Sequence, residues 1–408
     1  MTVKAERLRI DRDRLAELSG FTLEQIGECE RAGIIEAVDG VYEAIDILKL
    51  QLIGQVAENS GGVSRVIARY LEGGYPLGFL EMCLPASQEL SSITYRELMS
   101  TLGIPDEEAQ AVLRAAGLPM PGLDAPARMD EITAFEQYAA IRALPIPIDA
   151  RLHAMRVTGD SMRRATEVQA ELFRNHVVDP LLEAYREDLN QANDLIGEIS
   201  GRANEMISSL TAWVYQRYLE HETVKSVTER MEAAMVGSPL TASRPRDPSV
   251  AFVDLVGFTV LSADGGDREA ADLAQHFADH LLDMTAAYSG RLVKTMGDGA
   301  MLFFDNGAQA VRACLQLQQE LNGHGFPPIR VGINRGPVVA QAGDFYGNTI
   351  NIAARITDYA RPREVLVSST VLPDGAEGVD LEEIGEVTLK GVALPVRLYR
   401  AREVKGTD

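Results

Sequence analysis

Two aspartates in the second half of the chain stand where strongly apolar runs end in glycine. Asp254 lies in VAFVDLVGFT and Asp298 in RLVKTMGDGAMLFF, so each carboxylate is predicted to project from the end of a buried strand. Two carboxylates brought together repel each other by several kcal/mol at an effective dielectric of about 20, unless a cation lies between them. Because ligands that offer only oxygen favour Mg²⁺ or Mn²⁺, the pair indicates a divalent metal site that serves a phosphate substrate.

Four further residues complete the predicted site. Lys294 precedes Asp298 by four residues, and the segment GDFYGNTINIAAR contains Asp344, Asn351 and Arg355. Asn351 and Arg355 are four residues apart in a predicted helix, so an amide and a guanidinium share one face and can address the same phosphate. Lys294 and Asp344 offer a donor and an acceptor. This pair is complementary to the edge of adenine, whereas guanine reverses the pattern.

The elements that must position these residues follow from the patterning after Ser249. Apolar runs alternate there with helical stretches, and the runs are VAFVDLV, RLVKTM, AMLFF, IRVGIN, EVLVS and PVRLYRA. The first four strands and the two helices between them read β-α-β-β-α-β, which predicts a ferredoxin-like sheet. Glycines on both sides of Asp298 predict a tight hairpin turn. The fold would therefore place Asp298 at a hairpin tip beside Asp254 at the end of the first strand.

Residues 1–149 are predicted to form a helical region. Segments that begin at Leu15 and Arg96 share the order helix, glycine turn and helix, and each is followed by a further helical stretch. Two winged-helix-like repeats are one interpretation, and two helical hairpins that are alike by chance are the other. The first segment is similar to a MerR-type winged-helix hairpin. Its would-be recognition helix, TLEQIGECERAG, carries three glutamates and one arginine, which disfavours DNA binding.

Residues 150–236 are predicted to form long helices with an apolar stripe, interrupted at Pro180. A stalk or dimer seam explains the spacing as well as an intramolecular bundle does. Residues 237–249, GSPLTASRPRDPS, are rich in proline and are predicted to form a linker. The expected architecture is multidomain, with an all-α N-terminal region and a long helical stalk followed by an α/β domain over residues 250–403.

Composition limits the classes of protein that fit. The 408-residue chain is 46% hydrophobic, which is enough for two or three domains with cores, and its net charge of −21 makes a nucleic-acid partner unexpected. Cys29, Cys83 and Cys314 lack the spacing of a disulfide framework or a zinc site, so we expect buried thiols. The start of the chain lacks the apolar core of a signal peptide, and no run is long enough for a membrane helix. We therefore expect a cytoplasmic protein without a membrane span.

Residues 250–403 resemble the catalytic domain of class III nucleotidyl cyclases, specifically adenylate cyclases. The segments FVDLVGFT, KTMGDG, DFYGNTINIAAR and VTLKG occur in that order. The resemblance implies ATP as the substrate and two metal ions per site, Mg²⁺ or Mn²⁺. It also implies that Asp254 and Asp298 bind these ions, with the backbone carbonyl of Leu255 as a further ligand.

The resemblance also implies roles for the other residues of the site. Lys294 and Asp344 would recognise adenine, while Asn351 and Arg355 would serve the transition state. Lys390, in VTLKG, looks like the lysine that contacts the triphosphate. The residues after the first strand would present backbone N–H groups to the phosphates at a helix start, and these residues are Gly257, Phe258 and Thr259.

The implied reaction is attack of the ribose 3′-oxygen on the α-phosphorus of ATP, which gives cyclic AMP and pyrophosphate. In the family, the metal acids and the adenine readers of one domain serve different sites. The resemblance therefore implies a head-to-tail homodimer with two composite sites. No side-chain base is evident, because the histidines nearest in sequence are expected to be surface or packing residues, and these are His276, His280 and His324.

The N-terminal half resembles the helical regulatory regions of soluble actinobacterial cyclases in architecture alone. Because activity would depend on how two subunits face each other, we expect this half to regulate it. The effector stays open between a small molecule and a proton, for which His153, His176 and His221 are candidates.

Two alternatives to an adenylate cyclase follow from the same residues. One is a transcription regulator whose degenerate cyclase domain only binds nucleotide, and the intact set of six site residues speaks against it. The other is a guanylate cyclase, which keeps the mechanism and changes the base. Lys294 speaks against this one, since a glutamate at that position would have suggested GTP.

Overall fold

The computed structural model describes residues 3–71, 84, 89–119, 121–235, 247–258, 266–341, 344–374 and 379–403. The chain divides into two compact units, Met1–Glu232 and Ala233–Asp408. The first unit is helical apart from a short two-stranded sheet, and the second contains a seven-stranded sheet with helices on both faces. Among the described helices, none combines the length and the apolar character needed to cross a membrane.

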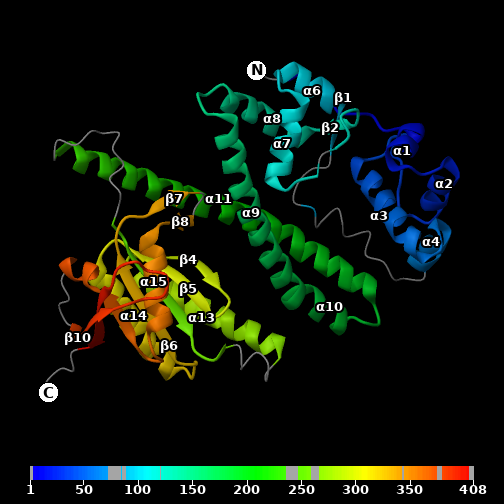
Figure 1. Ribbon diagram of the computed structural model, residues 1–408. Coiled ribbons are helices and arrows are strands. Elements are labelled where there is room, and N and C mark those ends of the chain that lie inside the picture. Colours follow the sequence, from blue (N-terminus) through cyan, green and yellow to red (C-terminus); the bar gives the residue numbers. More distant parts are fainter. Residues whose placement is uncertain are drawn as a thin grey trace. The chain divides into compact units, whose positions relative to one another are not determined.

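The first helical module, residues 10–71, packs four helices around a small core (Figure 1). They are α1 (Arg12–Ser19), α2 (Leu23–Arg31), α3 (Ala44–Ser60) and α4 (Val63–Leu71). Gly20 ends α1 with a φ of 76°, a left-handed cap that favours glycine, and Thr22 then starts α2 with a capping box. Leu15 and Ile26, one from each helix, are fully buried. The Gly-Phe-Thr turn therefore folds α1 and α2 onto one core.

The second helical module, residues 90–142, also joins two short helices at a glycine cap. It consists of β1 (Leu90–Thr94), α6 (Tyr95–Leu102), α7 (Asp106–Ala116), β2 (Pro126–Arg128) and α8 (Met129–Arg142). Gly103 ends α6 with a φ of 64°. β1 pairs antiparallel with β2, as Ile10 pairs with Tyr42 in the first module. The first module thus has a short backbone pairing beside four helices, and the second has one beside three.

Long helices follow the second module. α9 (Ile148–Phe173) continues through a π-helical segment, Arg174–Val178, into α10 (Asp179–Ala184), and α11 (Leu189–Met235) comes after a turn. Pro180 explains the widened turn, because its ring crowds the carbonyl four residues earlier and its nitrogen has no hydrogen to donate. α9 lies close to α7 at Gly159, where an added Cβ would be 2.3 Å from the carbonyl oxygen of Ala116.

The sheet of the second unit has the strand order β10-β11-β9-β6-β3-β5-β4. Its strands are β3 (Ser249–Leu255), β4 (Gly290–Met296), β5 (Gly299–Phe304), β6 (Ile329–Arg335), β9 (Val365–Ser368), β10 (Val379–Val387) and β11 (Val396–Glu403). The helices are α13 (Asp267–Ala287), α14 (Gly307–Gly323) and α15 (Asn348–Tyr359). The antiparallel neighbours β6-β3-β5-β4 with α13 and α14 form a ferredoxin-like core. The predicted fold class is confirmed.

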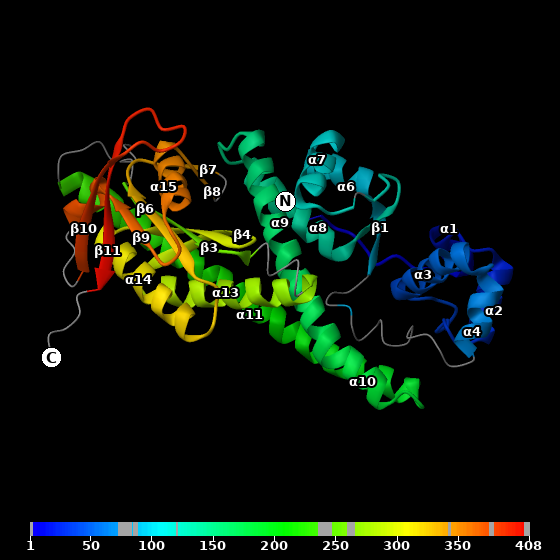
Figure 2. The ribbon, with the colours of Figure 1, turned by 60° about the horizontal axis from the view of Figure 1, so that its bottom comes forward.

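Helices cover the two faces of this sheet differently. Figure 2 shows α15 on one face and α13 with α14 on the other. Side chains alternate along β3: Ala251 and Val253 belong to the core shared with α13 and α14, whereas Val250 and Phe252 belong to the core shared with α15. Asp254 continues the second series, so its carboxylate lies on the α15 face.

Three strands of this unit were not predicted from the sequence. β7 (Val339–Gln341) and β8 (Asp344–Tyr346) have three residues each, too few to show a period. β10 is the edge strand of the sheet and carries acidic residues and Gly385. Its sequence therefore lacks the apolar run by which the other strands were predicted. The predicted linker over 237–249 lies mostly outside the described residues, and β3 begins at Ser249.

Candidate active site

Asp254 and Asp298 come together at the end of β3. Asp298 lies in the two-residue turn between β4 and β5, which Gly297 opens with a φ of 69°. The Leu255 N–H donates to the Asp298 carbonyl at 2.8 Å, and Asp254 is the register partner of Gly299. A Cβ on Gly299 would lie 3.6 Å from Oδ1 of Asp254. The two predicted metal acids therefore occupy adjoining positions.

Arg330, on β6, joins this site and was missed by the sequence analysis. Its Nε donates to Oδ2 of Asp254 at 2.6 Å, and its Nη1 donates to the carbonyl of Asp358 at 3.4 Å. Arg330 is the register partner of Asp254 on the neighbouring strand. A guanidinium in this place stabilises the ionised carboxylate and offers a phosphate-binding group beside it. The signal in the sequence was a lone charge within the apolar run IRVGIN.

Lys294 and Asp344, the two predicted adenine readers, contact each other. Nζ of Lys294 lies 2.6 Å from Oδ2 of Asp344, and the N–H of Phe345 donates to the other carboxylate oxygen at 2.8 Å. The hydrogen bond from Lys294, followed by that from Phe345, holds the pKa of Asp344 below its usual range. The Asp344 carboxylate is therefore ionised and oriented near neutral pH.

A β-bulge in β4 places two cations on the same face. The β4–β5 register shifts between Leu292 and Lys294, so that Arg291 faces Phe303 while Lys294 faces Met301. Residues three apart in a regular strand would point to opposite faces, and the bulge removes that difference. This alignment is not visible in the sequence, because no residue type marks a bulge of this kind.

Arg291 also contacts the segment that carries Asp344. Its guanidinium carbon lies 4.8 Å from the ring centre of Phe345, and the rings of Phe345 and Phe303 stack with centres 4.2 Å apart. Cation–π contact and ring stacking attach β8 to β4 and β5. Sequence analysis did not select these residues, which hold the predicted reader Asp344 in place.

Asn351 and Arg355 lie one turn apart on α15, and both are exposed. Nη1 of Arg355 is 2.8 Å from a carboxylate oxygen of Asp358. α15 lies directly on β6, because a Cβ at Gly332 would be 2.3 Å from the backbone nitrogen of Thr357. The close approach fixes the helix that presents the amide and the guanidinium.

The residues predicted to contact phosphate are spread over two loops. Gly257 follows β3 with a φ of 87°, and Phe258 is half-buried against the core of the sheet. Thr259 lies outside the described residues. Lys390 is exposed in the turn between β10 and β11, where the buried Leu389 anchors the chain. β10 and β4 are at opposite edges of the sheet, so Lys390 and Lys294 are separated within one chain.

The donor set at the end of β3 suits a hard divalent cation. Asp254 and Asp298 offer carboxylate oxygens, and the backbone of Leu255 offers a carbonyl. Within the described part of the chain, no three His, Cys, Asp or Glu side chains, as they are placed, converge around a metal ion. The residues therefore fit an ion that takes its remaining oxygen ligands from a phosphate substrate and from water.

Comparison with known proteins supports this chemistry. A family model described as Adenylate and Guanylate cyclase catalytic domain matches residues 241–401. A pH-sensitive adenylate cyclase of Mycobacterium tuberculosis is 31% identical over 329 residues, 76% of this chain and 78% of that protein. An adenylate cyclase of Streptomyces griseus is 29% identical over 236 residues, 58% of this chain and 54% of that protein. The crystal structure of the adenylyl cyclase CyaB from P. aeruginosa is 22% identical over 39% of this chain and 95% of that chain, with a TM-score of 0.36.

Proposed function

The chain belongs to the class III nucleotidyl cyclase family as an adenylate cyclase, and on that premise we propose that it converts ATP to 3′,5′-cyclic AMP and pyrophosphate by two-metal catalysis at composite homodimer sites. The observation that supports this most strongly is the meeting of Asp254 and Asp298 at the end of β3. The contact between Lys294 and Asp344 also supports it, because this donor and acceptor are complementary to adenine.

Each group of site residues would have a separate role in the reaction. When bound, two Mg²⁺ or Mn²⁺ ions would lower the pKa of the ribose 3′-hydroxyl and neutralise charge on the triphosphate. Asp254 and Asp298 would hold these ions. Arg355 would stabilise the charge that develops at the α-phosphate, and Asn351 would orient the ribose.

Base recognition uses the pair on β4 and β8. Lys294 would donate to a ring nitrogen of adenine, and Asp344 would accept from the exocyclic amine. Because Lys294 and Asp344 contact each other at 2.6 Å, adenine must separate them and take up both hydrogen-bonding groups. Guanine presents a carbonyl acceptor toward Asp344 and an N–H donor toward Lys294, so both contacts become repulsive.

The triphosphate would lie against backbone and basic groups. Gly257, Phe258 and Thr259 would present their N–H groups to it, as the start of a helix does for anions. Lys390 would contact the same triphosphate from the turn between β10 and β11.

We assign each active site to two copies of the chain. One copy would contribute Asp254 and Asp298, and the other the adenine readers with Asn351 and Arg355. Within one copy, Arg330 contacts both Asp254 and the backbone of Asp358. Arg330 therefore connects Asp254, which would serve one site, to helix α15, which would serve the other.

The N-terminal half would regulate catalysis by changing how the two copies face each other. α11 supports this role, since its 47 residues span about 70 Å at the usual helical rise. It exposes large apolar side chains such as Leu210, Trp213 and Tyr218, which a second copy of α11 would cover. A small molecule or a proton would be the effector, and the pH-sensitive relative favours the proton. A cytoplasmic location, without a nucleic-acid partner, is part of the same proposal.

The decisive experiment measures cyclic product from the purified full chain with Mn²⁺ and either ATP or GTP. Asp254→Ala and Asp298→Ala are each expected to lower cyclic AMP formation by about 1,000-fold, because loss of metal binding costs several kcal/mol of transition-state stabilisation. Asp380→Ala, an exposed acid on edge strand β10, is the matched control and keeps full activity. Undiminished activity in both site variants would reject the proposal. Cyclic GMP from GTP as the main product would make the enzyme a guanylate cyclase.

A further inference from the structure

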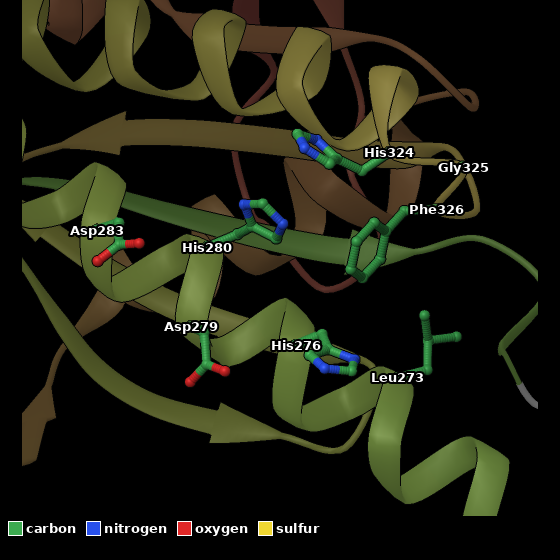
Figure 3. Close-up of a pocket in the computed structure, with 8 residues that line it drawn as sticks. All are labelled: Leu273, His276, Asp279, His280, Asp283, His324, Gly325 and Phe326. Carbon is green, nitrogen blue, oxygen red and sulfur yellow. The ribbon is translucent and has the colours of Figure 1, made fainter.

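Three of the chain's six histidines line one cavity in the catalytic unit, apart from the proposed active site (Figure 3). The cavity has a volume of about 420 Å³ and lies between α13 and the C-terminal end of α14. These helices cover the face of the sheet opposite to the one on which Asp254 lies. The polar and aromatic side chains around it are His276, His280, His324, Asp279, Asp283 and Phe326.

The spacing of the imidazoles is that of metal ligands. His276 and His280 are four residues apart on α13 and so lie on one face, an arrangement that binds zinc on other helices. The rings of His280 and His324 have centres 5.1 Å apart and are tilted by 48°. Two imidazoles that share a tetrahedral ion, with metal–nitrogen distances of about 2.1 Å, have ring centres about 5 Å apart. The pair from α13 and α14 already has this separation.

His324 is oriented in the way that a metal ligand requires. Its Nδ1 lies 2.8 Å from the backbone carbonyl of Glu320. A carbonyl only accepts, so Nδ1 must carry the proton and Nε2 of the neutral ring has a free lone pair. Histidines that bind metals usually donate their other ring N–H to a carbonyl or a carboxylate in this manner.

A third ligand requires one side-chain rotation. In the described residues, no three ligating side chains converge on an ion as they stand. Asp279 accepts a hydrogen bond from Gln275 at 3.0 Å, which holds it in place. His276 is exposed, and its position one turn before His280 brings its ring within reach of the same point. Water would complete a tetrahedral shell.

We propose that His276, His280 and His324 form a binding site for a borderline transition-metal ion, with Zn²⁺ as its best occupant. Imidazole nitrogens select such ions, whereas the carboxylates of the active site select Mg²⁺ or Mn²⁺. The bound ion links α13 to the end of α14 and thereby stabilises the catalytic unit. The site is independent of the proposed reaction.

The test is zinc binding to the full chain in excess Mg²⁺, measured by competition with a chromogenic zinc chelator. Wild-type protein is expected to bind one Zn²⁺ per chain. His280→Ala and His324→Ala each remove a ligand and weaken binding by at least the roughly 10–100-fold that loss of an outer-shell partner costs. His276→Ala weakens it as well. His176→Ala, an exposed histidine of the first unit, and Asp254→Ala retain the affinity of wild type.

A second variant separates a ligand from a packing residue. The ring of His280 makes an edge contact with Phe326, with centres 5.4 Å apart. His280→Phe keeps an aromatic ring there and removes the ligating nitrogens. It is expected to melt like wild type without zinc and to lose the rise in melting temperature that zinc gives wild type. Equal zinc affinity in wild type, His280→Phe and His324→Ala would overturn the proposal, as would a wild type that binds no zinc.

Discussion

The contact between Lys294 and Asp344 depends on the side chains around it. Asp344 takes hydrogen bonds from Lys294 and from the Phe345 N–H, and Phe345 is itself held by Phe303 and Arg291. Since these bonds lower the pKa of Asp344, the stability that they contribute is complete above the unfolded value of about 3.9 and is lost as the pH falls through the lowered pKa. The Asp344 carboxylate therefore keeps its charge and its orientation throughout the neutral pH range.

Removing the cation–π contact should loosen base recognition. Arg291→Ala is expected to raise the KM for ATP by roughly 2–30-fold, because such contacts contribute about 0.5–2 kcal/mol, while folding stays intact. Arg312→Ala, an exposed arginine on α14 in the opposite layer, is the control. Steady-state kinetics with ATP measure the effect, and an unchanged KM in Arg291→Ala would show that the contact does not position Asp344.

At the scale of helices and strands, a buried ionic network connects α9 to the second helical module. Glu108 on α7 is 9% exposed and accepts hydrogen bonds from the Tyr138 hydroxyl at 2.6 Å, Arg142 Nε at 3.1 Å and Arg151 Nη1 at 3.0 Å. Burial raises the pKa of Glu108, but these hydrogen bonds and the two arginine charges outweigh burial and the pKa is lowered. The network joins α7 and α8 to the start of the long helix.

Breaking this network should destabilise the first unit. Glu108→Ala is expected to cost about 3–5 kcal/mol, since it leaves Arg151, whose side chain is only 11% exposed, without its acid. Glu107→Ala, the exposed neighbour on α7, should change little. Differential scanning calorimetry of the full chain measures both.

The same network predicts a pH dependence. The stabilisation from ionised Glu108 is complete above the unfolded pKa of about 4.3 and disappears as the pH falls through the lowered folded pKa. The difference in melting temperature between wild type and Glu108→Ala should therefore shrink below about pH 4. A difference that stays constant into that range would contradict the assignment of the effect to the carboxylate charge.

At the scale of the whole molecule, composite sites make activity a property of two copies. Asp254→Ala and Arg355→Ala should each be inactive alone. Mixed and re-equilibrated one to one, half of the dimers are hybrids with one intact site of two, so about a quarter of wild-type activity should return. Co-purification of an untagged variant with an affinity-tagged one confirms that hybrid dimers form. If hybrids form and the mixture stays inactive, each site lies within a single chain.

Regulation by the N-terminal half is tested by removing it. A chain from Ser249 onward is expected to differ in specific activity from the full chain at matched dimer content, because subunit orientation is no longer constrained. The direction of the change reports whether the helical half inhibits or activates. Equal activity of the two proteins eliminates regulation by this half.

The sequence by itself determined the βαββαβ core and the adjacency of Asp254 and Asp298, because strand period, glycine turns and local order carry that information. It also placed Asn351 and Arg355 on one helical face. Only the tertiary structure decided that Arg330 pairs with Asp254, that a bulge aligns Arg291 with Lys294, and that His280 lies beside His324. These contacts join strands and helices distant in the chain, and packing selects them in ways that no local pattern of residues records.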